Sequence, residues 1–133
     1  MILVDSSGWI EFLTDGPLAR DYARRLGDGS GIITPSIVLY EVYKQAKRHR
    51  TDEDAAIAAA AIQKTEVIPL DDDLALEAAD LSLEHRLAMA DAIVLATARR
   101  YDAVVYTSDA DFEGIEGTVV LKKSQTPPPG SSS

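Results

Sequence analysis

The sequence predicts an α/β fold with three layers, in which helices cover both faces of a mostly parallel central sheet. Short apolar runs such as Ile2–Val4 and Ala103–Tyr106 have the composition of buried strands. Stretches with helical periodicity separate these runs, and this alternation is typical of parallel sheets. The length of 133 residues, of which 46% are hydrophobic, fits one domain with its own core.

The chain is expected to begin with a strand at Ile2–Val4. The polar segment Asp5–Ser7 can cap a helix that begins near Gly8. The pair Gly16–Pro17 ends that helix, and its proline can open a second helix that runs to about Gly27.

A second strand is expected at Ile32–Ile33. We expect Thr34 to cap the next helix, which would start at Pro35 and reach about His49. The later elements are expected at these ranges: a helix from 51 or 52 to about 64, a strand near the sheet edge at 67–70, a helix from 71–73 to about 85, a helix at about 88–100, and strands at 103–106 and 117–121.

The chain is expected to contain one folded unit, residues 1–123, followed by a tail at 124–133. The tail is rich in proline and serine, and such a composition predicts disorder. No internal repeat or second domain is evident in the sequence.

The composition excludes several classes of function. The chain has no cysteine, which excludes disulfides, thiolate catalysis and thiolate metal sites and fits a reducing cytoplasm. No apolar run is long enough to span a membrane and no signal-peptide pattern is present, so no membrane partner is expected.

The formal net charge of −9 weighs, at first sight, against a nucleic-acid substrate. Five of the 22 acidic residues belong to the site predicted below, and without them 17 acids face 13 bases, which leaves −4. A basic run contains Lys44, Lys47, Arg48 and Arg50. Two interpretations of this run stay open: contact with phosphates, or a solvated helix end whose cations suit the helix dipole.

Four acidic residues lie far apart in the sequence, yet the predicted fold would bring them together. Asp5 and Asp109 follow apolar strands, and sites in open parallel sheets lie beyond the carboxyl ends of the strands, where the strand order switches. Glu41 and Asp91 lie on apolar faces of predicted helices, where an unpaired carboxylate is costly.

Each acid also has a purely structural interpretation. Asp5 can be a helix cap, Glu41 can pair with a nearby base, and Asp109 and Asp111 are common turn residues. Asp91 is harder to explain in this way, because the helix dipole favours an acid in the first turn but not on the inward face. We expect Asp109 to be a ligand and Asp111 a supporting acid or a ligand of a second metal.

Carboxylates gathered without cysteine or histidine ligands suit a hard cation such as Mg²⁺ or Mn²⁺. The sequence therefore predicts a metal-dependent hydrolase that acts on phosphate esters. Three hydroxyl residues flank the acids and could orient them or a water molecule: Ser6, Thr107 and Ser108.

Four segments together resemble the acidic motifs of PIN-domain ribonucleases. They are Val4–Ser7, the helix from Pro35 to Glu41, Ala90–Ala98 and Thr107–Phe112. The likeness is to the VapC-type toxins of bacterial and archaeal toxin–antitoxin pairs, and it covers about residues 2–121. Each motif alone is weak, and it is the ordered set at these spacings that carries the resemblance. The proline-rich tail has no counterpart.

The resemblance implies a PIN-like α/β/α fold and Mg²⁺- or Mn²⁺-dependent hydrolysis of RNA by a metal-activated water. Asp5, Glu41, Asp91 and Asp109 would form the catalytic and metal-binding quartet, and Asp111 would be a more variable fifth acid. The resemblance also implies a homodimer, inhibition by a small cognate antitoxin, and action in the cytoplasm of a bacterium or archaeon.

Other classes fit the sequence less well. A phosphatase with an Asp-x-Asp nucleophile could use Asp109 and Asp111, but such enzymes need most of their domain downstream, and only 22 residues follow Asp111. A phospho-acceptor receiver domain needs paired acids after its first strand, where this chain has two serines after Asp5. The alternative that stays open is a PIN-like binding module without catalytic activity.

Overall fold

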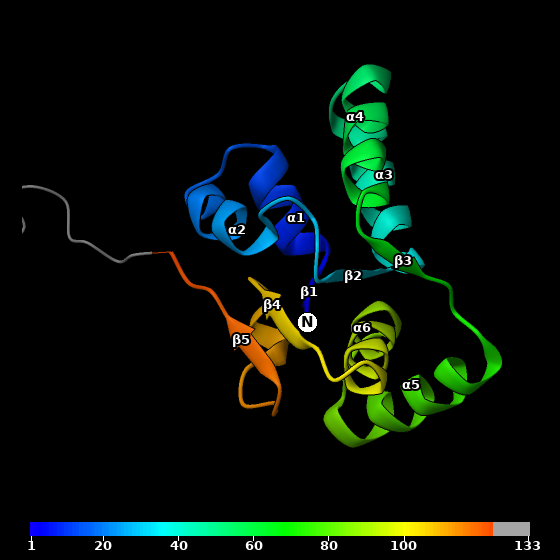
Figure 1. The fold of residues 1–133 in the computed structure, drawn as a ribbon. Helices are drawn as coiled ribbons and strands as arrows, with labels where there is room; N and C mark the ends of the chain where they lie inside the picture. The colour runs from blue at the N-terminus through cyan, green and yellow to red at the C-terminus, as the bar shows by residue number, and fades with distance from the viewer. Residues whose placement is uncertain (124–133) are drawn as a thin grey trace, which may run out of the picture.

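A computed structural model describes residues 1–123, which form a five-stranded sheet with helices around it (Figure 1). Every pairing of neighbouring strands is parallel, and the strand order is β3-β2-β1-β4-β5. The strands are β1 (Ile2–Val4), β2 (Ile32–Pro35), β3 (Glu66–Ile68), β4 (Val104–Thr107) and β5 (Thr118–Val120). The prediction of an α/β fold with a parallel sheet is confirmed. The tail predicted at 124–133 lies outside the described residues.

Helices cover both faces of the sheet. They are α1 (Ser6–Leu13), α2 (Ala19–Leu26), α3 (Ser36–His49), α4 (Asp52–Gln63), α5 (Asp72–His85), α6 (Met89–Arg100) and the short 3-10 helix η1 (Ala110–Phe112). Helices α1 and α2 lie on one side of the sheet and α5 and α6 on the other, while α3 and α4 pack against each other and extend away from it (Figure 1). No helix of residues 1–123 has both the length and the apolar character needed to cross a membrane.

The strand order places the ends of β1 and β4 side by side. From β1 the chain goes to β2 and β3 on one side of the sheet, and then returns to β4 on the other side. Val4 at the end of β1 pairs in register with Tyr106 of β4. The order of the strands therefore switches between β1 and β4, which is where open parallel sheets place their sites. Asp5 directly follows β1, and Asp109 comes two residues after β4.

The start of α3 differs from the prediction. Thr34 and Pro35 belong to β2, and α3 begins at Ser36 without a side-chain cap. Thr34 is fully buried, and its hydroxyl oxygen lies 2.7 Å from that of Thr65. The Thr34 hydroxyl is therefore hydrogen-bonded within the core and does not cap α3.

Three other boundaries also differ from the prediction. Helix α1 begins at Ser6, two residues earlier than predicted, because Asp5 is the residue that caps it. Helix α2 begins at Ala19, so that Pro17 lies in the preceding turn rather than in the helix. The strand predicted near an edge is β3, which occupies one edge of the sheet and ends before Pro69, a residue that has no N–H to donate to a neighbouring strand.

The core lies between the sheet and the helices that pack on it. Leu3, Ile33 and Val105 of the three central strands are fully buried. Residues 92–98 of α6 are also all buried, and this helix packs on β1, β2 and β4. Asp91 therefore stands at the N-terminal end of a buried helical segment, close to the edge of the sheet where β1 and β4 end.

Candidate active site

Asp5 is held at the end of β1 by hydrogen bonds from two directions. Its Oδ1 accepts from the backbone N–H of Gly8 at 3.1 Å and from the Ser7 hydroxyl at 2.7 Å. Its Oδ2 accepts from the Thr107 hydroxyl at 2.6 Å. Asp5 is only 3% exposed, so it caps α1 and at the same time presents a buried carboxylate beside the end of β4.

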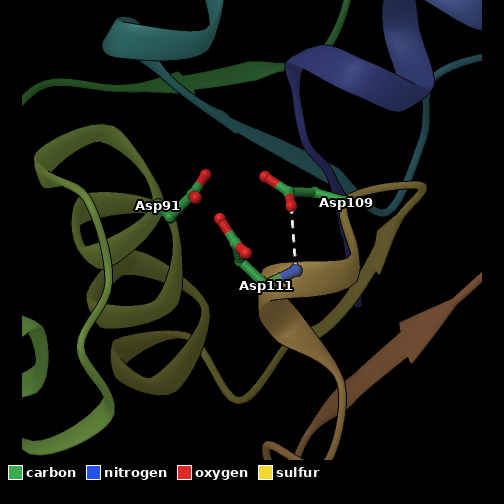
Figure 2. Close-up of side chains that lie close together, drawn as sticks. All are labelled: Asp91, Asp109 and Asp111. Carbon is green, nitrogen blue, oxygen red and sulfur yellow. Dashed lines mark hydrogen bonds between the residues drawn. The ribbon is translucent and has the colours of Figure 1, made fainter.

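Three further carboxylates meet at the same edge of the sheet. Asp91 lies in the first turn of α6, Asp109 follows β4, and Asp111 lies in η1. One oxygen from each lies within 4.8 Å of the others (Figure 2). Figure 2 shows Asp91 pointing from its helix towards the turn that carries Asp109 and Asp111. Within this turn, Asp109 Oδ1 accepts the backbone N–H of Asp111 at 2.9 Å.

Glu41 approaches the site from α3. It is half-buried, and burial is the main cause of its raised pKa. The charge of Asp5 raises this pKa further, whereas the Ser6 hydroxyl and the charge of Lys44 lower it. The Glu41 carboxylate therefore lies within electrostatic range of Asp5. Among residues 1–123, however, the group of oxygens within 4.8 Å includes neither Glu41 nor Asp5.

Burial and repulsion from neighbouring carboxylates disfavour the charged forms of Asp5, Glu41 and Asp91. The pKa of Asp91 is raised to about 7, first by burial and then by the charges of Asp109, Asp5 and Glu41. The pKa of Asp5 is also raised, because burial outweighs the three hydrogen bonds that stabilise its charged form. No ion pair within residues 1–123 involves any of the five acids, so no basic side chain balances their charge directly.

This set of donors fits a divalent cation. The donors are carboxylate oxygens, which hard cations such as Mg²⁺ and Mn²⁺ prefer. The oxygens of Asp91, Asp109 and Asp111 lie close enough together to coordinate a common ion. A cation at this position would also reverse the repulsion that raises the pKa of Asp91.

Comparison with known proteins agrees with this geometry. The family profile of the PIN domain matches residues 2–117, which is most of the chain. The chain belongs to the PIN domain family. It has no match among the curated proteins.

Several solved structures share this PIN fold. A toxin–antitoxin complex from Klebsiella pneumoniae contains a chain that is 25% identical, with a TM-score of 0.77, and the match covers 90% of this chain and 97% of that one. The sarcin–ricin loop cleaving toxin VapC of Mycobacterium tuberculosis is 22% identical, with a TM-score of 0.68 and coverage of 85% and 92%. DNA-bound VapBC from Salmonella typhimurium is 20% identical, with a TM-score of 0.70 and coverage of 91% and 98%. The resemblance and the PIN-like fold predicted from the sequence are thereby confirmed.

The structure also shows polar residues in the candidate active site that the sequence did not indicate. Thr107 orients Asp5 as expected, but Ser7 does so as well, and Ser7 was not among the hydroxyl residues expected to act in this way. The Ser108 hydroxyl lies 2.7 Å from the hydroxyl of Tyr22 on α2 rather than beside an acid. The position of Ser7, two residues after Asp5 at the start of a helix, could have indicated a hydrogen bond to that carboxylate. No local pattern indicates that Tyr22 lies near the site.

Proposed function

We propose that this PIN domain protein is a toxin with Mg²⁺- or Mn²⁺-dependent endoribonuclease activity, neutralised by a cognate antitoxin. The observation that supports this most directly is the group of Asp91, Asp109 and Asp111 oxygens within 4.8 Å, which lies within electrostatic range of the buried Asp5. We assign the catalytic and metal-binding roles to Asp5, Glu41, Asp91 and Asp109, with Asp111 as a further metal ligand.

The nuclease unit would comprise residues 1–123, whose own groups bind and orient the reactants. When bound, a divalent ion supplies Lewis-acid stabilisation for the scissile phosphate and the attacking water. Hydrogen bonds to both oxygens of Asp5 hold this carboxylate in one orientation, so it need not reorganise when RNA arrives. Asp111 is the exposed member of the acidic group and lies where the site opens to solvent.

The protein partner follows from the same family relationship. The likeness to the Klebsiella toxin–antitoxin complex extends over 90% of the chain and supports an antitoxin as the cognate inhibitor. Homodimerisation is a further part of the proposal, because VapC-type toxins are the proteins that the acidic motifs resemble. The proposed setting is the cytoplasm of a bacterium or archaeon, where an RNA substrate and a protein antitoxin are both available.

The basic run on α3 divides into two pairs. Lys47 and Arg50 form ion pairs with acids at the start of α4, at 3.0 and 3.5 Å. Lys44 and Arg48 form no ion pair within residues 1–123, and Lys44 lies close enough to Glu41 to lower its pKa. We propose that this second pair contacts RNA phosphates at the rim of the site, while the first pair joins α3 to α4.

Exposed aromatic rings accompany these bases. Tyr40 is 57% exposed and Tyr43 is 40% exposed on α3. The Lys44 ammonium lies 5.4 Å from the centre of the Tyr40 ring. The nucleobases of a single strand can stack on such rings while neighbouring lysine and arginine side chains contact the phosphates. This face of α3 therefore suits single-stranded RNA.

The proposed activity can be tested by mapping RNA 5′ ends after brief expression of the wild type and of Asp5→Asn. New 5′ ends should appear with the wild type alone, and the purified wild type should cleave RNA in Mn²⁺ but not in EDTA. If no new ends appear and calorimetry detects no Mn²⁺ binding, the alternative of a PIN-like binding module is correct instead.

The phosphate contacts can be tested through the salt dependence of RNA binding. Each contact on a single strand contributes a slope of about −0.7 in a plot of log K against log salt. Replacing Lys44 and Arg48 by Gln should flatten this slope and raise KM, with Mn²⁺ affinity nearly unchanged. The matched control replaces Lys47 and Arg50 by Gln, which removes the same charge from the ion-paired positions. If both double variants have the same slope, the basic side chains of α3 are only solvated residues near a helix end and do not contact phosphates specifically.

A further inference from the structure

Tyr22 is a buried residue of α2 whose hydroxyl reaches the candidate active site. The residue is fully buried, and its hydroxyl oxygen lies 2.7 Å from Ser108 Oγ. Ser108 directly precedes Asp109 and is 86 residues away from Tyr22 in the sequence. Burial raises the pKa of Tyr22 to about 12, above an ordinary value at which the phenol already keeps its proton near neutral pH.

Hydrogen bonds continue from Ser108 to the carboxylate of Asp5. The Ser108 backbone N–H donates to Ser7 Oγ at 2.9 Å, and the Ser7 hydroxyl donates to Asp5 Oδ1 at 2.7 Å. The backbone N–H of Asp109 donates to Thr107 Oγ1 at 2.9 Å, and the Thr107 hydroxyl donates to Asp5 Oδ2 at 2.6 Å. Two routes therefore join the turn after β4 to the two oxygens of Asp5, and the Ser108 side chain anchors this turn to α2.

Gly8 leaves open the space that the Tyr22 ring fills. A Cβ atom at position 8 would lie 2.5 Å from Tyr22 Cε1 and 2.5 Å from Val4 Cγ1, which is closer than real Cβ contacts allow. Glycine is disfavoured within a helix, yet it stands in the first turns of α1, where its N–H donates to Asp5. The absence of a side chain at position 8 thus allows the Tyr22 ring to pack against α1 beside the site.

We propose that Tyr22 is a positioning residue of the nuclease, which holds the Ser108 turn so that Asp5 and Asp109 keep the geometry needed for metal binding. The inference rests on the proposed function, and it concerns a residue whose hydroxyl bonds to Ser108 and, within the described chain, to none of the five acids. Losing an outer hydrogen-bond partner of a metal ligand typically costs about 10- to 100-fold in affinity or activity. Because Tyr22 acts through Ser108, we expect a loss at the lower end of this range.

The test compares wild type with Tyr22→Phe, which keeps the ring in the space beside Gly8 and removes only the hydroxyl. The kcat for RNA cleavage should fall by about 10-fold with KM nearly unchanged, and the calorimetric Kd for Mn²⁺ alone should rise by a similar factor. Ser108→Ala removes the other partner and should cause the same loss. The double variant should lose no more than either single variant, because both act through one hydrogen bond.

Thr34→Val is the matched control. It breaks a hydroxyl pair of the same 2.7 Å length, between Thr34 and Thr65, and within residues 1–123 neither hydroxyl forms a hydrogen bond with any of the five acids. This control should lower the melting temperature but leave kcat and Mn²⁺ affinity unchanged. Wild-type kcat and Mn²⁺ affinity in Tyr22→Phe would overturn the inference, and so would an equal loss in Thr34→Val. If the wild type neither cleaves RNA nor binds Mn²⁺, the proposed function is overturned and this inference with it.

Discussion

Two groups of three aspartates in this chain have opposite electrostatic character. Asp71–Asp73 are consecutive, exposed and placed at the start of α5. Asp91, Asp109 and Asp111 come from two separate segments and meet where β1 and β4 end. A count of acids in a sequence window would favour the first group as a cation site, whereas the folded structure favours the second.

The consecutive group is stabilised by its local surroundings. Asp71 caps α5 by accepting the backbone N–H of Leu74 at 2.8 Å, and the Arg100 guanidinium donates to its other oxygen at 2.8 Å. Both contacts lower the pKa of Asp71. The N-terminal end of the helix dipole favours negative charge as well. The charge of Asp71 is therefore balanced by Arg100 and by the N-terminal end of α5.

The assembled group lacks a basic partner within the described residues. Burial and the charge of Asp109 raise the pKa of Asp91 to about 7, and no basic residue of the described chain forms an ion pair with it. Carboxylates held together at this electrostatic cost mark a functional site more reliably than acids in a row. Matched substitutions in the two groups test this comparison.

The largest expected effect is on RNA cleavage. Asp91→Asn should lower kcat/KM by more than about 100-fold, because loss of a direct ligand should exceed the loss of an outer partner. Asp71→Asn removes the same charge from the first group and should leave cleavage unchanged. Full activity in a folded Asp91→Asn protein would remove this residue from the site.

The next effect is on stability in the presence of metal. At a free Mn²⁺ concentration 100 times its Kd, binding should add about 2.7 kcal/mol to the free energy of unfolding of the wild type. Urea denaturation in EDTA and in Mn²⁺ measures this difference. Asp71→Asn should keep the gain, and Asp91→Asn should lose most of it. Identical midpoints for the wild type in the two buffers would contradict a shared metal site.

The two groups should also respond to pH with opposite signs. The folded pKa of Asp91 is raised to about 7, so between the ordinary aspartate pKa and pH 7 the folded state binds the extra proton. The stability of the metal-free wild type should therefore fall as the pH rises through this window, and Asp91→Asn should reduce the fall. The pKa of Asp71 is lowered, so its stabilising contribution should be lost on acidification. Melting temperatures in EDTA between pH 3 and 8 measure both trends.

Mn²⁺ affinity should rise with pH, whereas the stability of the metal-free protein falls, because the carboxylates bind metal only after losing their protons. Calorimetric affinity should therefore increase from pH 6 to pH 8 in the wild type. The slope should be the same in Asp71→Asn. A slope of zero in the wild type would mean that Asp91 does not bind the ion.

The smallest expected effect concerns Asp71→Ala, which removes a helix cap and an ion pair together. The melting temperature should fall by a few degrees, and by less in Asp71→Asn, because asparagine also caps helices. Neither variant should change Mn²⁺ affinity. A weakened affinity in Asp71→Ala would show that the two groups are coupled and would break the comparison.

Local patterns were sufficient for most of the fold. Thr51 caps α4 and Asp71 caps α5, in agreement with the expected helix starts, because a cap depends on atoms only three residues away. The prediction for Thr34 was wrong, because its hydroxyl partner, Thr65, is 31 residues distant and no local pattern reveals it. The start of α1 moved for a local reason instead, because Asp5 caps the helix through the N–H of Gly8. Long-range contacts therefore explain only some of the boundaries that differ.

The same distinction applies to the acidic site. The order of residues was enough to place Asp5 and Asp109 after strands and Asp91 on an inward helix face, because strand and helix periods set these positions. The assignment of metal binding to these acids stays a prediction that the experiments above address. The ion pairs of Lys47 and Arg50 were not predicted, although their acidic partners lie five and four residues further along the chain, because the turn between α3 and α4 interrupts the helical spacing.

The residue identities show where the carboxylates stand in the chain. Backbone periodicity and chain order then establish on which faces these carboxylates lie and at which end of the sheet they emerge. They do not show which carboxylates lie close enough to raise one another's pKa, or that Asp111 lies beside Asp91 and Asp109. They also do not show that the Tyr22 ring packs beside Gly8 and that its hydroxyl reaches Ser108. Those relations depend on the folded arrangement, because burial, repulsion and steric fit act over a few ångströms between residues that are tens of positions apart in the chain.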